Sequence, residues 1–128
     1  MPIRLTEELK AAALDVAQMY EPLEDPLLVG SCVWLGEGND IDVVVRVKDA
    51  SLQCGGERCS SNAYGPMAAY RHGVVNIIAI ECERMWAGWE HAAKVMPTVP
   101  RDLIADKDSR VAECEKLRAI GESNCLSD

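Results

Sequence analysis

The sequence predicts an α+β (mixed α/β) fold: a small mixed sheet with helices packed against it. Residues 6–20 and residues 81–96 repeat apolar side chains at helical spacing. Residues 41–48 alternate apolar and polar side chains, which is typical of a strand with one buried face. Residues 74–80 are apolar on both faces except at Asn76, and such a strand is expected inside a sheet.

Length and composition predict one domain, residues 1–128, with a helix at 6–20, a sheet core at 27–80 and C-terminal helices at 81–121. A chain of 128 residues that is 48% hydrophobic is long enough to bury a core. The chain start resembles no secretory signal and no apolar run could span a bilayer, so we expect a cytoplasmic protein without a membrane partner. A net charge of −8 without a basic stripe argues against strong nucleic-acid binding.

The cysteines are expected to be reduced thiols, several of them in the core, because no secretory signal precedes them. Cys54 and Cys59 have no second pair at zinc-site spacing, which argues against a zinc site.

The first helix is expected to begin after Thr6, whose side chain is a suitable N-cap. Glu7 and Glu8 lie in its first turn, where the helix dipole favours negative charge. Pro22 and Pro26 then end the helix and form a turn.

A strand, a turn and a second strand follow in the centre of the chain. Residues 27–29 predict a short buried strand. Residues 31–35 predict a single helical turn with Ser31 as its cap, and residues 36–39 a flexible loop. The strand at 41–48 comes next.

Two aspartates open this second strand. Asp40 and Asp42 are separated by one residue, so on an extended chain their side chains point the same way. Mg²⁺ prefers oxygen ligands and keeps several waters, so two carboxylates suffice to hold it. Upstream, Gly30 would let the backbone approach a phosphate, and Ser31 offers a hydroxyl. The alternatives are a solvated loop end for the aspartates and a plain helix cap for Ser31.

Gly30 and Ser31, followed after eight residues by Asp40 and Asp42, resemble the signature of the nucleotidyltransferase superfamily, which includes DNA polymerase beta. The resemblance is best over residues 27–80. It implies a minimal nucleotidyltransferase-like fold and a Mg²⁺-dependent transfer of a nucleotidyl group from a nucleoside triphosphate to an acceptor. More loosely, the chain is similar to small bacteriophage-encoded nucleotidyltransferase-like proteins in the stretch YRHGVVNIIAI, the tryptophan-bearing helix and the stretch DKDSRV.

The resemblance also implies roles for single residues. Asp40 and Asp42 would be catalytic and hold a suspected pair of Mg²⁺ ions. The nucleotide would be bound by Gly30, Ser31 and Asn76. Independently of the resemblance, Arg71 is expected to bind it too, because a guanidinium suits forked contacts to a triphosphate. The acceptor, or a protein partner in its place, is not identified by the sequence.

Asn76 stands where the superfamily carries a third carboxylate; the alternative is a buried polar residue whose hydrogen bonds are satisfied by a neighbouring strand or loop. An amide oxygen ligates a metal but carries no charge and cannot act as a general base. Glu81 is the nearest acid, and its offset places it on the opposite strand face. A second hypothesis is therefore a catalytically weak member of the same fold that acts by binding a protein or a nucleotide.

Other polar residues are weaker candidates. Arg71 is a better triphosphate clamp than Arg46, for which a surface salt bridge is the simpler interpretation. Lys107 and Arg110 are expected to be solvated residues at a helix start. His72 lies beside the proposed site in sequence and could assist proton transfer or serve the loop.

The remaining segments carry weaker patterns. Residues 49–72 are rich in glycine and serine and predict an extended loop, which is more often functional than idle. Trp86 and Trp89 are expected in the core on the helix at 81–96. The last helix is expected to begin near Asp102 or Asp108 and to end at Gly121, with a frayed tail after it.

Overall fold

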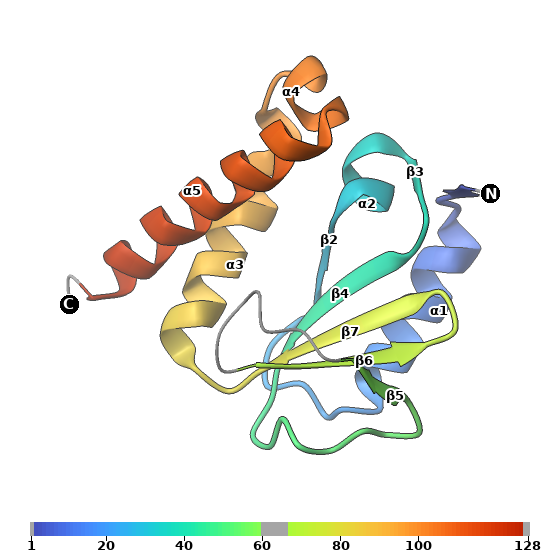
Figure 1. Ribbon diagram of the computed structural model, residues 1–128. Helices are drawn as coiled ribbons and strands as arrows, with labels where there is room; N and C mark the ends of the chain where they lie inside the picture. Colours follow the sequence, from blue (N-terminus) through green and yellow to red (C-terminus); the bar gives the residue numbers. More distant parts are fainter. Residues whose placement is uncertain (1, 60–66, 127–128) are drawn as a thin grey trace. The chain divides into compact units, whose positions relative to one another are not determined.

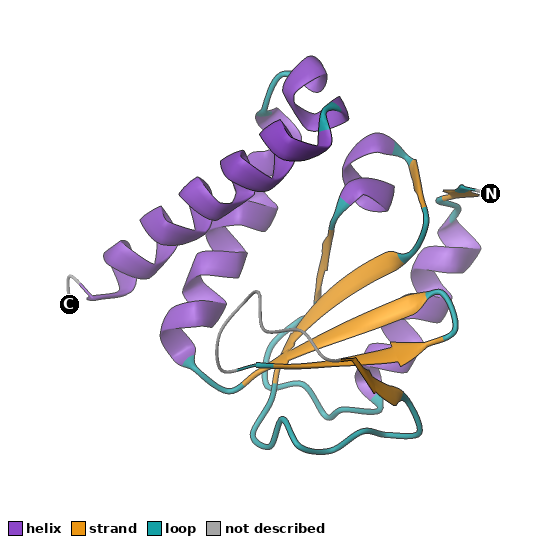
Figure 2. Ribbon diagram, viewed as in Figure 1, coloured by secondary structure: helices purple, strands orange, loops and turns teal. Residues whose placement is uncertain are grey.

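The protein has an α+β fold that combines helices with a mixed sheet, as the sequence predicts (Figure 2). The structure, a computed structural model, describes residues 2–59 and 67–126. The chain divides into two compact units, Met1–Cys82 and Glu83–Asp128. The organisation into one domain stays a prediction, and the two units are described separately below.

The first unit contains a five-stranded sheet with the strand order β2-β4-β7-β6-β5. β4 and β7 run parallel, and the other neighbouring strands are antiparallel. β7 is the central strand, which confirms the prediction from its apolar sequence. The strands are β2 (Leu27–Val29), β4 (Ile41–Arg46), β5 (Glu57–Cys59), β6 (Ala68–His72) and β7 (Val75–Ile80).

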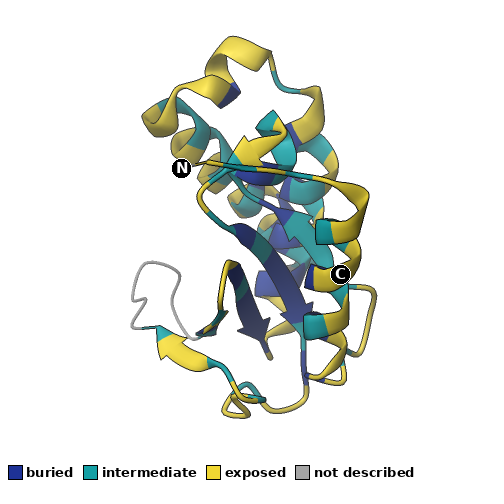
Figure 3. Ribbon diagram, turned by 90° about the vertical axis from the view of Figure 1, so that its right-hand side faces the viewer, coloured by how far each residue is buried: buried dark blue, intermediate teal, exposed yellow. Residues whose placement is uncertain are grey.

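One face of this sheet packs on α1 (Glu7–Gln18) (Figure 1). The alternation in β4 directs Ile41, Val43 and Val45 into this core, where each is fully buried. Ala13 and Ala17 of α1 lie in the same cluster. Figure 3 shows the buried residues concentrated in the middle strands of the sheet. Asp42, on the alternate positions of β4, therefore faces away from α1.

The start of α1 confirms the predicted cap. The backbone N–H of Leu9 donates to Thr6 Oγ1 at 3.1 Å, and Glu7 and Glu8 occupy the first turn. The helix ends at Gln18, so the buried Tyr20 lies in the following turn.

The predicted helical turn is present as α2 (Ser31–Leu35), but Ser31 does not cap it. Gly30 is the N-cap residue, with φ of 94° and ψ of 177° and no side-chain hydrogen bond. This backbone conformation is essentially restricted to glycine. The prediction of Ser31 as the cap is therefore wrong: Ser31 is the first residue of the helix, and the cap position before it is Gly30.

The predicted flexible loop at residues 36–39 is also wrong. It contains β3 (Glu37–Gly38), which pairs with β1 (Ile3–Arg4) in a two-stranded sheet. The N–H of Leu5 extends this contact by donating to the carbonyl of Gly36 at 2.9 Å. Each strand has two residues, which is too short for any alternation to be visible in the sequence.

Residues 49–72 do not form one irregular loop, because β5 and β6 lie within them. β6 pairs with β7 as a hairpin in which His72 lies opposite Val75. Gly73 has φ of 63° and occupies the first position of the two-residue turn, where glycine is favoured. Part of the predicted loop, residues 60–66, lies outside the described residues.

The second unit is helical: α3 (Glu83–Val95), the 3₁₀ turn η1 (Met96–Thr98), α4 (Arg101–Ala105) and α5 (Lys107–Leu126). Helices therefore begin near both predicted positions. The break between α4 and α5 is at Asp106, whose carboxylate accepts hydrogen bonds from the backbone N–H and the hydroxyl of Ser109.

Gly121 does not end the last helix, so that prediction and the frayed tail at residues 122–126 are wrong. α5 continues to Leu126, while residues 127–128 lie outside the described residues. A Cβ atom added to Gly121 would lie 2.6 Å from the carbonyl oxygen of Ala87 and 2.8 Å from the Cα atom of Gly88. Gly121 thus permits close packing of α5 on α3, and it is not a cap.

Trp86 and Trp89 of α3 are buried, as predicted for core residues. Within the second unit, the guanidinium of Arg118 lies 4.4 Å from the ring centroid of Trp89. Across the part of the chain that the structure describes, no helix is both long and apolar enough to cross a membrane.

Candidate functional site

The parallel pairing of β4 with β7 and the antiparallel pairing of β7 with β6 bring three polar residues into one row. Asp42 on β4 lies opposite Asn76 on β7, and Asn76 lies opposite Arg71 on β6. All three therefore occupy the sheet face away from α1. Asn76 therefore lies beside Asp42 in the sheet.

Asp40 joins this row from the residue position just before β4 begins. The amide Nδ2 of Asn76 donates to Asp40 Oδ2 at 2.9 Å and to Asp42 Oδ1 at 3.1 Å. Arg71 donates from Nη2 to the same Asp40 Oδ2 at 3.1 Å and from Nε to Asn76 Oδ1 at 3.2 Å. These four side chains are called the carboxylate cluster below.

Gly30 forms the boundary of the carboxylate cluster on the β2 side. A Cβ atom at this position would lie 2.5 Å from Asp42 Oδ2. Gly30 therefore gives room to the Asp42 carboxylate as well as the backbone conformation that starts α2. Ser31 Oγ lies beside Gly38 of β3, where a Cβ atom on Gly38 would come within 2.9 Å of it.

The two carboxylates affect each other electrostatically. Burial, and after it the charge of Asp40, raises the pKa of Asp42 to about 6 against the opposing effects of Asn76 and Arg71. The thiol of Cys32, buried in α2, also has a raised pKa through burial and through the charges of both aspartates. Both shifts disfavour the charged form of the group, and a nearby positive charge would oppose them.

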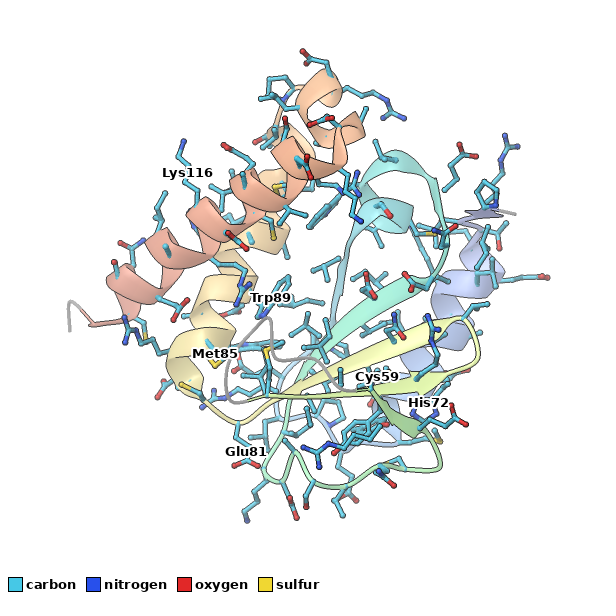
Figure 4. The ribbon with its side chains drawn as sticks, in the orientation of Figure 1. Cys59, His72, Glu81, Met85, Trp89 and Lys116 are labelled. Carbon is cyan, nitrogen blue, oxygen red and sulfur yellow. The ribbon has the colours of Figure 1, made fainter. Side chains whose placement is uncertain are left out.

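Other residues singled out from the sequence lie elsewhere in the first unit. Figure 4 shows His72 and Glu81 at opposite ends of the sheet. Glu81 accepts a hydrogen bond from the backbone N–H of Ala50 at 2.8 Å, so it does not replace the missing third carboxylate. Arg46 forms an ion pair with Glu24 at 2.7 Å, in agreement with the simpler interpretation of that residue.

His72 belongs to a separate network on the α1 face. The hydroxyl of Tyr20 donates to the carbonyl of Gln53 at 2.7 Å and lies 2.5 Å from His72 Nε2. A hydroxyl has one proton and a carbonyl cannot donate, so Nε2 of His72 must carry a hydrogen. This network lies on the α1 face of the sheet, and the carboxylate cluster lies on the other face. His72 therefore does not take part in the carboxylate cluster.

Cys54 and Cys59 each lie close to a backbone carbonyl. The thiol of Cys54 donates to the carbonyl of Met19, and that of Cys59 to the carbonyl of Glu57. All six cysteines fall within the described ranges and none of them forms a disulfide.

In the second unit, Lys107 is the first residue of α5, and Arg110 donates to the carbonyl of Ile104 at 2.9 Å.

Comparisons of the chain with protein-family models, with curated proteins and with solved structures found no significant match. The structural argument for a function therefore starts from the chemistry of the carboxylate cluster.

The donor set of the carboxylate cluster fits a hard divalent cation that also binds a ligand. It offers two carboxylates and one amide, whereas Mg²⁺ in nucleotide sites is held by one or two carboxylates together with phosphate oxygens. Among residues 2–59 and 67–126, no group of three or more His, Cys, Asp or Glu residues could hold a metal on its own. Two carboxylates and one amide would leave the remaining positions of an octahedral Mg²⁺ to other oxygen ligands.

The sequence alone does not reveal that Arg71 joins Asp40 to Asn76, because the stretch 49–72 predicts a loop. Two signals could have located β6: the alternation of Ala68, Tyr70 and His72, and Gly73 placed for a hairpin turn. Alanine is a poor strand former, and this weakens the pattern.

Proposed function

We propose that this chain is a nucleotidyltransferase-like protein that transfers a nucleotidyl group from a nucleoside triphosphate to an unidentified acceptor with Mg²⁺. One observation carries the proposal: carboxylate oxygens from Asp40 and Asp42 converge on a single atom, Nδ2 of Asn76. Two acids aimed at one point provide a place for a positive charge. The sequence resemblance to the superfamily, at the same two aspartates, supports the same function.

The residues around that point have distinct roles in the proposal. Asp40 and Asp42 would hold the magnesium, and Gly30 and Ser31 would lie against the phosphates. Magnesium, when bound, would supply the positive charge that stabilises the transferring group. Arg71 is half exposed and carries a forked donor that suits a phosphate.

A second candidate function is nucleotide or protein binding without transfer. Asn76 favours it, because an amide supplies neither the charge nor the proton acceptor of a third carboxylate. A protein of this kind would retain the cation and the nucleotide but would not activate an acceptor hydroxyl.

Calorimetric titration of ATP and GTP in the presence of Mg²⁺ tests the binding site. We expect the wild-type protein to bind one of these nucleotides and Asp40→Ala/Asp42→Ala to lose that binding. Asp15→Asn is a matched control, because it removes one exposed carboxylate from α1 and should leave binding unchanged. Failure of the wild-type protein to bind either nucleotide would refute the proposed function.

Transfer is tested separately by incubating the protein with labelled nucleotide and a cell extract. Incorporation of label that depends on Asp42 supports the enzyme, whereas binding without incorporation supports the second candidate. Asn76→Asp would restore the third carboxylate, and we expect it to increase incorporation if the acid is what the site lacks.

A further inference from the structure

The carboxylate cluster already contains a positive charge supplied by the chain. Asp40 Oδ2 accepts two hydrogen bonds, one from Asn76 and one from Arg71. This oxygen is therefore already occupied by a guanidinium and an amide, and a divalent cation placed on it would compete with both donors. A cation can reach it only if these donors move.

Arg71 is able to move away from this position. Its side chain is 49% exposed, compared with 27% for Asp40, and its described hydrogen bonds go only to Asp40 and Asn76. Partly exposed ion pairs contribute little to stability, so exchanging this one for another partner requires little free energy. Two positive charges on one carboxylate oxygen would repel each other, so a bound cation would displace the guanidinium.

We infer that Arg71 is a resident counter-cation that couples the binding of the divalent cation to the binding of the nucleotide. Without nucleotide, Arg71 competes with the cation for Asp40. With nucleotide bound, the displaced guanidinium forms charge-assisted hydrogen bonds to a phosphate beside the carboxylate cluster. The site then binds a free cation weakly and a cation–nucleotide complex strongly. This inference depends on the proposed function.

Titrations with Mn²⁺, followed by electron paramagnetic resonance, measure both halves of the coupling. Mn²⁺ accepts the oxygen ligands that Mg²⁺ uses and reports its own binding. In Arg71→Gln we expect free Mn²⁺ to bind about five-fold more tightly, because the competing ion pair is gone. The Mn²⁺–ATP or Mn²⁺–GTP complex should bind about ten-fold more weakly, because the phosphate contact is lost.

Two further variants sharpen this experiment. Arg58→Gln removes the same charge from β5 at a position paired with Tyr70, on the opposite sheet face, and should change neither affinity. Arg71→Lys keeps the charge but not the forked donor, so free Mn²⁺ should still bind weakly while the nucleotide complex loses affinity. Circular dichroism of each variant establishes that it is folded.

The outcomes separate this inference from the proposed function. If Arg71→Gln and the wild-type protein bind free Mn²⁺ equally while both bind nucleotide, the coupling is refuted and the proposed function stands. If neither protein binds Mn²⁺–ATP or Mn²⁺–GTP, the proposed function fails and the inference fails with it.

Discussion

Replacing Gly30 with alanine should destabilise the first unit through two separable effects. The backbone at Gly30, with φ of 94° and ψ of 177°, costs a non-glycine residue about 1–3 kcal/mol. The added Cβ atom would also lie 2.5 Å from Asp42 Oδ2, and such overpacking costs about 1–3 kcal/mol. Together the two effects should lower the free energy of unfolding by about 2–6 kcal/mol. This is a large part of the ~5–15 kcal/mol by which a small protein is typically stable.

Urea denaturation followed by circular dichroism measures this loss, and Gly36→Ala provides the control. Gly36 also has a positive φ, 87°, but an added Cβ atom there meets nothing within 4 Å. Gly36→Ala should therefore show only the conformational cost, about 1–2 kcal/mol.

A double-mutant cycle with Asp42→Ala isolates the steric effect. Truncating Asp42 removes the two nearest atoms and leaves its Cβ atom at 3.5 Å, an ordinary contact distance. The cycle should give a coupling free energy of about 1 kcal/mol or more between the two positions. If Gly30→Ala is as destabilising with Asp42→Ala as without it, the close approach of Gly30 and Asp42 is not what restricts this position.

Three further predictions follow from contacts described above. The pKa of Asp42 is raised from 3.8 to about 6 in the folded protein, so the folded state binds more protons than the unfolded chain between these values. The free energy of unfolding should thus fall by about 3 kcal/mol as pH rises through this window, and Asp42→Asn, compared at each pH in urea, should lack this fall. Gly121→Ala should lower the thermal unfolding temperature, because the added Cβ atom would clash with α3. The expected net loss in the free energy of unfolding is about 1–3 kcal/mol, despite the better helix propensity of alanine. The control Ser123→Ala, at an exposed position of α5, should not lower the unfolding temperature. ¹⁵N NMR should find the Nε2–H tautomer of neutral His72, and an Nδ1–H tautomer would contradict the proposed proton arrangement. Tyr20→Phe removes the hydroxyl from this network and should lower the free energy of unfolding by about 1–3 kcal/mol.

Elements with a clear period were predictable from the sequence. The Thr6 cap and the buried face of β4 depend on local patterns, and the structure has both. The central place of β7 followed from its continuous apolar sequence. The position of Asn76 beside Asp42 came from the family resemblance and was reproduced by the sheet register.

Elements that depend on tertiary contacts were not predictable. β1 and β3 have two residues each and exist only because they meet. Gly121 was interpreted as a helix end, since a glycine that caps and a glycine that packs against another helix look the same in a sequence. The sequence shows which residues of the site can hold a cation or a phosphate. The ion pair between Arg71 and Asp40 depends on the position of β6, which the sequence did not predict.

The parallel pairing of β4 with β7 also determines when the carboxylate cluster can form during folding. Asp42 and Asn76 are 34 residues apart in the chain, and Asp40 and Arg71 are separated by 31. Closing such long loops carries an entropic cost before any contact is made, and parallel pairing is intrinsically slow. While the chain is being synthesised, the two aspartates emerge well before Arg71 and Asn76, which hydrogen-bond to them. The side chains that define the site are thus assembled only when the β6–β7 hairpin has docked on β4.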